Sequence, residues 1–135
     1  MESVITIRPI EKKDLEWARK LRNANRKHFF DVREISRAVH ARWFASRTHS
    51  FFIIERGGVR VGTIALRKIG EGYEIHNVLI DQSYRRMGIL RQVLKKLEKQ
   101  YAPPFFVDVL AGNDDAVRAY TRLGFLPFAV RMQKK

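Results

Sequence analysis

Residues 81–99, "DQSYRRMGILRQVLKKLEK", place two arginines and a glycine directly before a helical pattern. A helix N-terminus presents unpaired backbone N–H groups and a partial positive charge, and a glycine there lets an anion approach the backbone. Arg85 and Arg86 add guanidinium groups, which pair bidentately with phosphate oxygens. With Gly88 they favour a cradle for a pyrophosphate, although an ordinary surface turn with solvated arginines uses the same residue types.

A second pattern, "NDDAVRAYTRLGF", begins at Asn113 and has the features of a complete short helix. Asn113 is a good capping residue, and Gly124 suits the position just after a helix. Ala116 and Tyr120 are four residues apart and share one face. Helix formation explains the presence of Asn113 and Gly124. It does not decide the role of Tyr120, which is either a half-buried packing residue or a catalytic residue.

Composition excludes several classes of site. The chain has 135 residues, 45% of them hydrophobic, which predicts a single domain over residues 1–135 with its own core. It has no cysteine, so disulfides, thiolate metal sites and a cysteine nucleophile are excluded. The four histidines have no metal-ligand spacing, and no Gly-x-Ser-x-Gly elbow is present. We therefore expect neither a metal site nor a serine hydrolase.

Net charge and hydropathy indicate which partners the chain attracts and where in the cell it is expected. The chain carries 27 Lys and Arg against 14 Asp and Glu, a formal charge of +13, which attracts phosphates, nucleotides or nucleic acid without choosing between them. No stretch is long and apolar enough to span a bilayer, and the N-terminus lacks the apolar core of a signal peptide. We expect a cytoplasmic chain with no membrane contact.

Hydrophobic periodicity predicts an α/β (mixed α+β) fold. A strand "VITIRPI" leads to a helix after Asp14, and Ser36 caps a second helix. An antiparallel meander then gives way to a β-α-β-α-β unit with one parallel strand pair. The expected segments of the meander and the unit are "SFFIIE", "VRVGTIALRK", "YEIHNVLID", a helix at 88–100, "FFVDVLA", a helix at 114–123 and a final strand "LPFAVRMQ". Ligands bind outside strand carboxyl ends, which here places a site at residues 81–90.

The two motifs, taken in this order, resemble the GNAT superfamily of acyl-CoA-dependent N-acyltransferases. In that family a strand leads to a loop Gln/Arg-x-x-Gly-x-Gly/Ala whose amides hold the CoA pyrophosphate, and Asn-x-x-Ala-x-x-x-Tyr with Gly-Phe follows on a later helix. The resemblance implies an acetyltransferase that uses acetyl-CoA as cosubstrate. It implies that cofactor-binding groups lie at Val78, Leu79, Ile80, Arg85, Arg86, Met87, Gly88, Ile89, Leu90, Asn113 and Tyr120.

Leu90 and Arg86 depart from the family pattern, since the family prefers glycine or alanine at the first position and often has glycine at the second. Leu90 either turns toward the core and leaves the backbone amides free, or crowds the cofactor. The resemblance gives Tyr120 the role of proton donor to the departing thiolate. The amine also needs a base, and the candidates are Glu74 and His76, which alternate on one strand and share a face.

The acceptor side corresponds to "LRNANRKHFFDVREISRAVHARWF", which resembles family members that acetylate nucleotide-linked amino sugars. By this resemblance Phe30, His40 and Trp43 line the acceptor pocket, while Arg22 and Arg26 neutralise a phosphate. The expected acceptor is a small anionic or nucleotide-linked amine. Two alternatives stay open: an amine carried by nucleic acid, and a non-catalytic basic binding module whose cofactor site Leu90 blocks. The oligomeric state is either monomer or homodimer.

Overall fold

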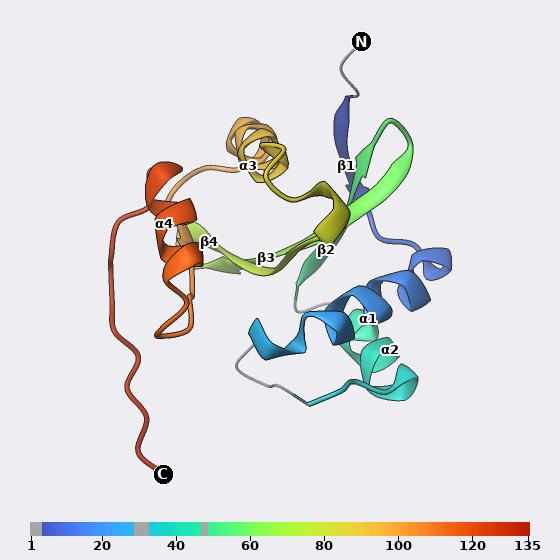
Figure 1. Ribbon diagram of the computed structural model, residues 1–135, viewed down its shortest axis with the longest axis horizontal. Coiled ribbons are helices and arrows are strands. Elements are labelled where there is room, and N and C mark those ends of the chain that lie inside the picture. Colours follow the sequence, from blue (N-terminus) through green and yellow to red (C-terminus); the bar gives the residue numbers. More distant parts are fainter. Residues whose placement is uncertain (1–3, 29–32, 47–48) are drawn as a thin grey trace.

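The computed structural model describes residues 4–28, 33–46 and 49–135 (Figure 1). Five strands form one mixed sheet in the order β1-β2-β3-β4-β5. The strands are β1 (Ile5–Pro9), β2 (Ser50–Arg56), β3 (Val59–Ile69), β4 (Gly72–Ile80) and β5 (Phe105–Val107). β1 to β4 are antiparallel neighbours, and β5 runs parallel to β4.

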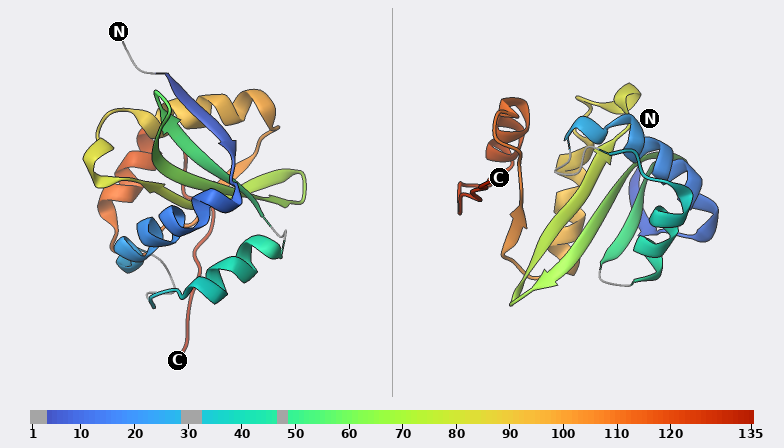
Figure 2. Two further views of the ribbon diagram at one scale, coloured as in Figure 1. Left: turned by 90° about the vertical axis from the view of Figure 1, so that its right-hand side faces the viewer. Right: turned by 90° about the horizontal axis from the view of Figure 1, so that it is seen from below.

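The helices cover both faces of this sheet. In chain order they are α1 (Leu15–Ala24), α2 (Arg37–Ala45), α3 (Ile89–Gln100) and α4 (Asp114–Arg122), with short 3-10 turns η1 (Lys12–Asp14), η2 (Arg26–His28) and η3 (Gln82–Tyr84). Figure 1 shows α3 on one side of the sheet and α1 and α2 on the other. β5 and α4 stand off to the side of β4, as the two views of Figure 2 also show.

The main core lies between α3 and the sheet. The apolar stripe of α3 supplies Ile89, Val93, Leu94 and Leu97, all buried, and it packs against buried residues of the strands. These strand residues are Ile5, Ile54, Val61, Ile64, Leu66 and Ile75. The helical spacing of large apolar residues in "ILRQVLKKL" therefore fixes which face of α3 turns inward.

Asp14 ties the first strand to the start of α1. Its carboxylate is fully buried and accepts two hydrogen bonds from Arg8, at 2.7 and 2.9 Å. Arg60 of β3 lies 3.0 Å from the same carboxylate. The hydrogen bond from Arg8 outweighs the opposing effect of burial and lowers the pKa of Asp14 to about 2. The buried charge is thus paired and stays ionised at neutral pH.

Most of the expected elements are confirmed. The antiparallel meander, the parallel pair, the capping of α2 by Ser36 and the helices at 89–100 and 114–122 all occur. Two expectations are wrong. The strand expected at "FFVDVLA" pairs only over Phe105–Val107, and "LPFAVRMQ" forms no strand, because residues 126–133 pair with no strand of the sheet. None of the helices in the described residues is long and apolar enough to cross a membrane.

Candidate active site

The central feature of the candidate site is the parting of β4 and β5. The two parallel strands pair only at Tyr73–Phe105, Glu74–Phe106 and Ile75–Val107. β4 continues to Ile80, whereas β5 ends at Val107. Beyond Ile75 the edge of β4 therefore has no strand beside it on the β5 side. Backbone N–H and C=O groups along such an edge are available to an extended ligand that carries amides.

A β-bulge lies on β4 just where the strands part. Thr63 pairs with Leu79 and Ala65 pairs with His76, so Asn77 and Val78 together oppose the single residue Ile64. Asn77 has φ +51, in the left-handed region that asparagine tolerates better than most residues. Its carbonyl accepts a hydrogen bond from the Thr63 hydroxyl at 3.1 Å. The Thr63 side chain thus supplies a hydrogen bond to the Asn77 carbonyl in place of a backbone N–H of the neighbouring strand.

The bulge changes which residues face each side of β4. Before it, Ile75 faces the core under α3; after it, Val78 and Ile80 do so. Asn77 and Leu79 instead line a recess on the side of α1 and α2. The inserted residue therefore shifts the alternation of β4 by one, so that even-numbered residues face the core after the bulge, whereas odd-numbered residues do before it.

The loop after β4 leads into a helix N-terminus with no side-chain cap. Gly88 is the N-cap of α3, with φ +72, and the first turn has no acidic residue. A Cβ added to Gly88 would have no other described group within 4 Å. Arg86 is also left-handed, at φ +64. The first turn of α3 thus has no side-chain cap and no acidic residue, and it follows two arginines, an arrangement that suits an anion.

Arg85 and Arg86 lie differently from each other. Arg85 reaches back toward α1, donating to Asn25 Oδ1 at 2.6 Å and to the Ile80 carbonyl at 3.2 Å. Asn25 is buried and also donates to Leu21. Arg85 therefore fastens the loop to the end of α1. Arg86 and Met87 are exposed.

Leu90 turns toward the protein. Its side chain is partly buried and packs against the core that α3 forms with the sheet. Of the two orientations expected from the sequence, the structure has the inward one, which leaves the space in front of the loop unobstructed by Leu90.

α4 carries the second motif as expected. The Asn113 side chain caps the helix by accepting a hydrogen bond from the Ala116 amide at 3.2 Å. Tyr120 is partly buried, and its ring meets Phe125 edge-on at 5.4 Å. Burial raises the pKa of Tyr120 to about 12. The phenol therefore keeps its proton at neutral pH and is able to donate it.

Glu74 and His76 share one face of β4 and lie together. Glu74 accepts a hydrogen bond from Arg67 Nε at 2.7 Å. Burial alone would raise the pKa of Glu74, but the hydrogen bond and charge of Arg67, together with His76, lower it. His76 Nε2 lies 3.5 Å from Glu74 Oε1 and is buried without a hydrogen-bond partner among the described residues. The two candidate bases thus differ, since Glu74 is hydrogen-bonded by Arg67, whereas His76 Nε2 lies beside the Glu74 carboxylate without a formed hydrogen bond.

The aromatic recess lies between α1, α2 and the strands β2 to β4. Its wall includes Arg22 and His40 and the aromatic residues Trp43, Phe44, Phe51 and Phe52. Burial, with the charge of Arg19, lowers the pKa of His40 to about 4, so this imidazole is neutral at physiological pH. Arg22 is buried, lies 6.0 Å from the Trp43 ring centre and donates to the Arg33 carbonyl at 2.8 Å.

Arg26, one of the two remaining expected acceptor residues, lies apart from the aromatic recess. Arg26 is exposed and lies 3.4 Å from Glu34. It is not among the residues that line the aromatic recess. Phe30 lies outside the described residues. The structure thus brings Arg22, His40 and Trp43 together in one wall, but it does not place Arg26 with them.

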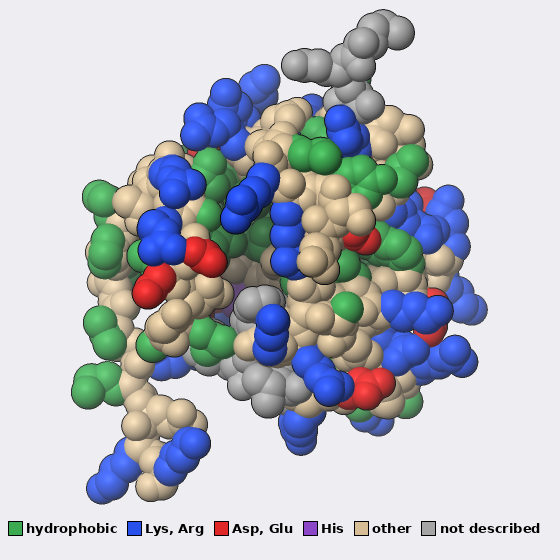
Figure 3. All heavy atoms as spheres, viewed as in Figure 1, with side chains coloured by type: hydrophobic (Ala, Val, Ile, Leu, Met, Phe, Trp, Pro, Cys, Tyr) green, Lys and Arg blue, Asp and Glu red, His purple; other side chains and the backbone are tan. Residues whose placement is uncertain are grey.

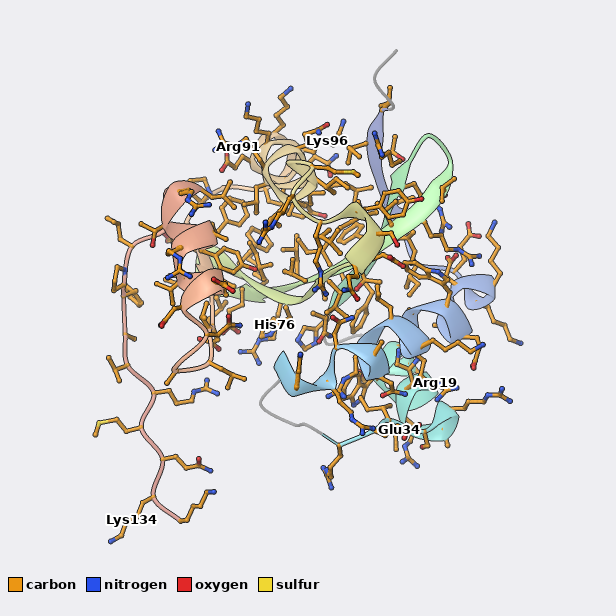
Figure 4. All side chains as sticks on the ribbon, viewed as in Figure 1. Arg19, Glu34, His76, Arg91, Lys96 and Lys134 are labelled. Atoms are coloured by element: carbon orange, nitrogen blue, oxygen red, sulfur yellow. The ribbon has the colours of Figure 1, made fainter. Side chains whose placement is uncertain are left out.

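Sequence reasoning missed Asn77, Thr63 and Asn25. Of these three residues, only Asn77 could have been predicted from the sequence, because an asparagine inside an apolar strand favours a bulge. Among the described residues no cluster of three or more His, Cys, Asp or Glu is able to hold a metal ion. Figure 3 shows Lys and Arg spread over the visible face, with a hollow beside α4 in which a histidine is visible. In Figure 4, His76 lies on the α1 side of the sheet, whereas Arg91 and Lys96 point outward from α3.

Comparison with known proteins places this geometry in context. The family model "Acetyltransferase (GNAT) family" matches residues 14–125. The chain is 27% identical over 99 residues to the N-alpha-acetyltransferase RimI of Mycobacterium tuberculosis (strain ATCC 25618 / H37Rv), a match that covers 70% of this chain and 63% of RimI. The chain therefore spans less than two thirds of that relative's length.

Solved structures share the fold. A domain from Methanocaldococcus jannaschii DSM 2661 has a TM-score of 0.79 and 25% identity, covering 93% of this chain and 90% of that one. The protein yncA from Salmonella typhimurium, with its cofactor acetyl-CoA, has a TM-score of 0.72 and 19% identity, covering 93% of this chain and 81% of that one.

Proposed function

The chain belongs to the acetyltransferase (GNAT) family, and from that premise we propose that it transfers an acetyl group from acetyl-CoA to a primary amine. The observation that carries the proposal is the uncapped N-terminus of α3, with Gly88 at φ +72 and open space above it. It follows directly on β4, whose edge beyond Ile75 has no strand beside it. An anion site next to a free strand edge fits a ligand that joins a pyrophosphate to an amide-bearing arm.

The fit assigns roles to the loop residues. The backbone amides from Met87 to Leu90 would hold the pyrophosphate, with the exposed Arg86 adding charge. The edge of Val78, Leu79 and Ile80 would hydrogen-bond the amides of the pantetheine arm. Arg85 acts on the ligand through the loop that it fastens to Asn25, not through direct contact. Asn113 supports the site by capping α4.

Bound acetyl-CoA would supply a thioester, from which acetyl transfer forms an amide bond, breaks the C–S bond and passes one proton from amine to sulfur. Tyr120 is protonated at neutral pH, as any phenol is and as its raised pKa also requires, and we assign it as the donor to the leaving sulfur. We assign His76 as the base, directly or through water, because Glu74 is already held by Arg67.

The residues that line the aromatic recess indicate which class of acceptor amine the protein binds. Arg22, the one Lys or Arg among the described residues that line the recess, is buried against Trp43 and donates a hydrogen bond to a backbone carbonyl, and Arg26 pairs with Glu34. Neither is presented as a phosphate ligand. The recess therefore supports a primary amine next to an apolar or aromatic group, such as the α-amine of a peptide, over the nucleotide-linked amine suggested by the sequence. The name of RimI, an N-alpha-acetyltransferase, is consistent with this choice.

The inward packing of Leu90 argues against the non-catalytic alternative, whose physical basis was obstruction of the loop by this side chain. The alternative of an acceptor amine on nucleic acid is supported only by the net charge of +13. The panel of acceptors described below tests it.

Gly88→Val should weaken acetyl-CoA binding by about tenfold or more, because a β-branched residue resists positive φ and would fill the space above the loop. Isothermal titration calorimetry measures the affinity. The matched control is Gly70→Val, since Gly70 has φ +55 and equally open surroundings in the β3–β4 turn. Gly70→Val should bind acetyl-CoA as the wild type does. Equal acetyl-CoA affinities for the two variants would show that the loop at Gly88 does not bind the pyrophosphate.

Tyr120→Phe should lower kcat by about a hundredfold, the usual size of a general-acid contribution, while the KM for acetyl-CoA changes little. The ring contact with Phe125 survives this substitution, so stability should be retained. Steady-state thiol release gives both parameters. Unchanged kcat would reduce Tyr120 to a packing residue.

An acceptor panel at saturating acetyl-CoA should rank peptides with an apolar first residue above amino sugars, nucleotide-linked amino sugars, polyamines and transfer RNA. Trp43→Ala should reduce the preference for apolar neighbours by opening the wall of the recess. A nucleotide-linked sugar at the head of the ranking would contradict the apolar acceptor. If transfer RNA is the best acceptor and activity falls steeply with salt concentration, the acceptor amine is carried by nucleic acid and the net positive charge serves to bind it.

A further inference from the structure

The side of α3 that faces away from the core is a row of basic side chains. Arg91, Lys95 and Lys99 follow one another at four-residue intervals and so share one face of the helix. All three are exposed, whereas the apolar stripe on the opposite side is buried. Lys96, which is partly buried, also points outward from α3 in Figure 4, as Arg91 does. These four residues, 91, 95, 96 and 99, are here called the α3 basic face.

α3 differs from the other three helices in how its charges are paired. Arg19 of α1 and Arg37 of α2 both pair with Glu16, at 2.6 and 3.2 Å. Arg118 of α4 pairs with Asp115. Within the part of the chain that the structure describes, no carboxylate lies within ion-pair distance of the α3 basic face, whose cations also have no other recorded partner. The fold therefore leaves the charge of α3 uncompensated.

The sequence around α3 adds to this local excess. Residues 82–107 contain one acidic residue, Glu98, and the basic residues Arg85, Arg86, Arg91, Lys95, Lys96 and Lys99. A segment with so few carboxylates has a positive potential that neighbouring side chains do not cancel. The formal charge of +13 is thus expressed strongly on the α3 side of the sheet.

The spacing of the row suits an extended polyanion. Each residue of an α-helix advances the axis by about 1.5 Å, so Arg91, Lys95 and Lys99 lie about 6 Å apart and span about 12 Å along the axis. A line of cations is complementary to a line of anions. The phosphate backbone of a nucleic acid is such a line, because it carries a negative charge at every nucleotide.

The polarity of the same face selects among polyanions. The exposed residues of α3 are all polar, since besides the cations they are Gln92, Glu98 and Gln100. A helix that lies on a membrane buries apolar side chains in it. Proteins that bind single strands stack the bases on aromatic side chains. α3 offers neither kind of side chain, whereas non-specific binding to a double helix requires only cations that contact phosphates.

We propose that the α3 basic face binds the phosphate backbone of double-stranded nucleic acid. The nucleic acid is a partner here and not the acetyl acceptor. RNA and DNA duplexes should both bind, independently of base sequence, because the phosphates are common to all of them. Acetyl-CoA should not compete, since Lys95 and Lys99 lie beyond the residues assigned to the pyrophosphate. The proposal does not depend on the proposed transferase activity.

Fluorescence anisotropy with short labelled RNA and DNA duplexes, at several salt concentrations, tests the proposal. The logarithm of the affinity should fall linearly with the logarithm of salt concentration, and each lost phosphate contact should reduce the slope by about 0.9. Lys95→Gln combined with Lys99→Gln should therefore reduce the slope by about 1.8. The matched control is Lys12→Gln with Lys20→Gln, which removes the same charge from exposed residues on the α1 side of the sheet (Figure 1). The control should keep the wild-type slope.

Four results would overturn the proposal. They are a wild type that binds no duplex, equal slopes for the two double variants, displacement of the duplex by acetyl-CoA, and tighter binding to anionic phospholipid vesicles than to the duplexes at the same salt concentration. The last result would assign the face to a membrane surface. Circular dichroism identifies variants that do not fold. Acetyl-CoA calorimetry on the same samples tests the proposed function separately, because duplex binding is measured without acetyl-CoA.

Discussion

The site depends on the early parting of β4 and β5. Parallel strands normally gain a hydrogen-bonded neighbour along their length, yet these two pair at only three positions, ending at Ile75. The bulge at Asn77 follows at once. Because of it, the alternation of β4 shifts by one residue, so that Val78 and Ile80 face the α3 core and Leu79 lines the aromatic recess. The open edge begins where β4 parts from β5, the loop follows at the end of β4, and Asn77 and Leu79 of the same strand line one wall of the recess.

Several arginines of this chain make structural contacts within the fold. Arg8 and Arg60 hold Asp14, Arg67 holds Glu74, Arg22 stacks on Trp43, and Arg85 fastens the loop to Asn25. The anion site that we propose at the N-terminus of α3 would therefore rely on backbone N–H groups and the helix dipole more than on guanidinium groups. Gly88 is the residue that allows this, since it reaches positive φ without strain and has no side chain to cover the amides.

Local patterns predicted the elements whose causes are local. The stripe of α3, the caps at Ser36 and Asn113 and the antiparallel meander follow from periodicity and hydrogen bonding within a few residues. Position in space was harder to predict. Arg85 was expected at a phosphate, but its partner Asn25 lies sixty residues earlier, and nothing in "YRRMG" indicates that contact. Residues 126–133 alternate as a strand does but pair with no strand among the described residues, since pairing depends on an edge distant in the sequence.

The central claim is that acetyl-CoA lies across the N-terminus of α3 and the edge of β4. An amide NMR titration of the wild-type protein with acetyl-CoA tests it most directly, because it reports on the backbone groups that the account assigns to binding. The account predicts saturable shifts at Met87 to Arg91 and at Asn77 to Ile80 in the same titration. Shifts confined to the basic pocket around Arg8, Lys13 and Arg60, or scattered over the lysine surface without saturation, would contradict it.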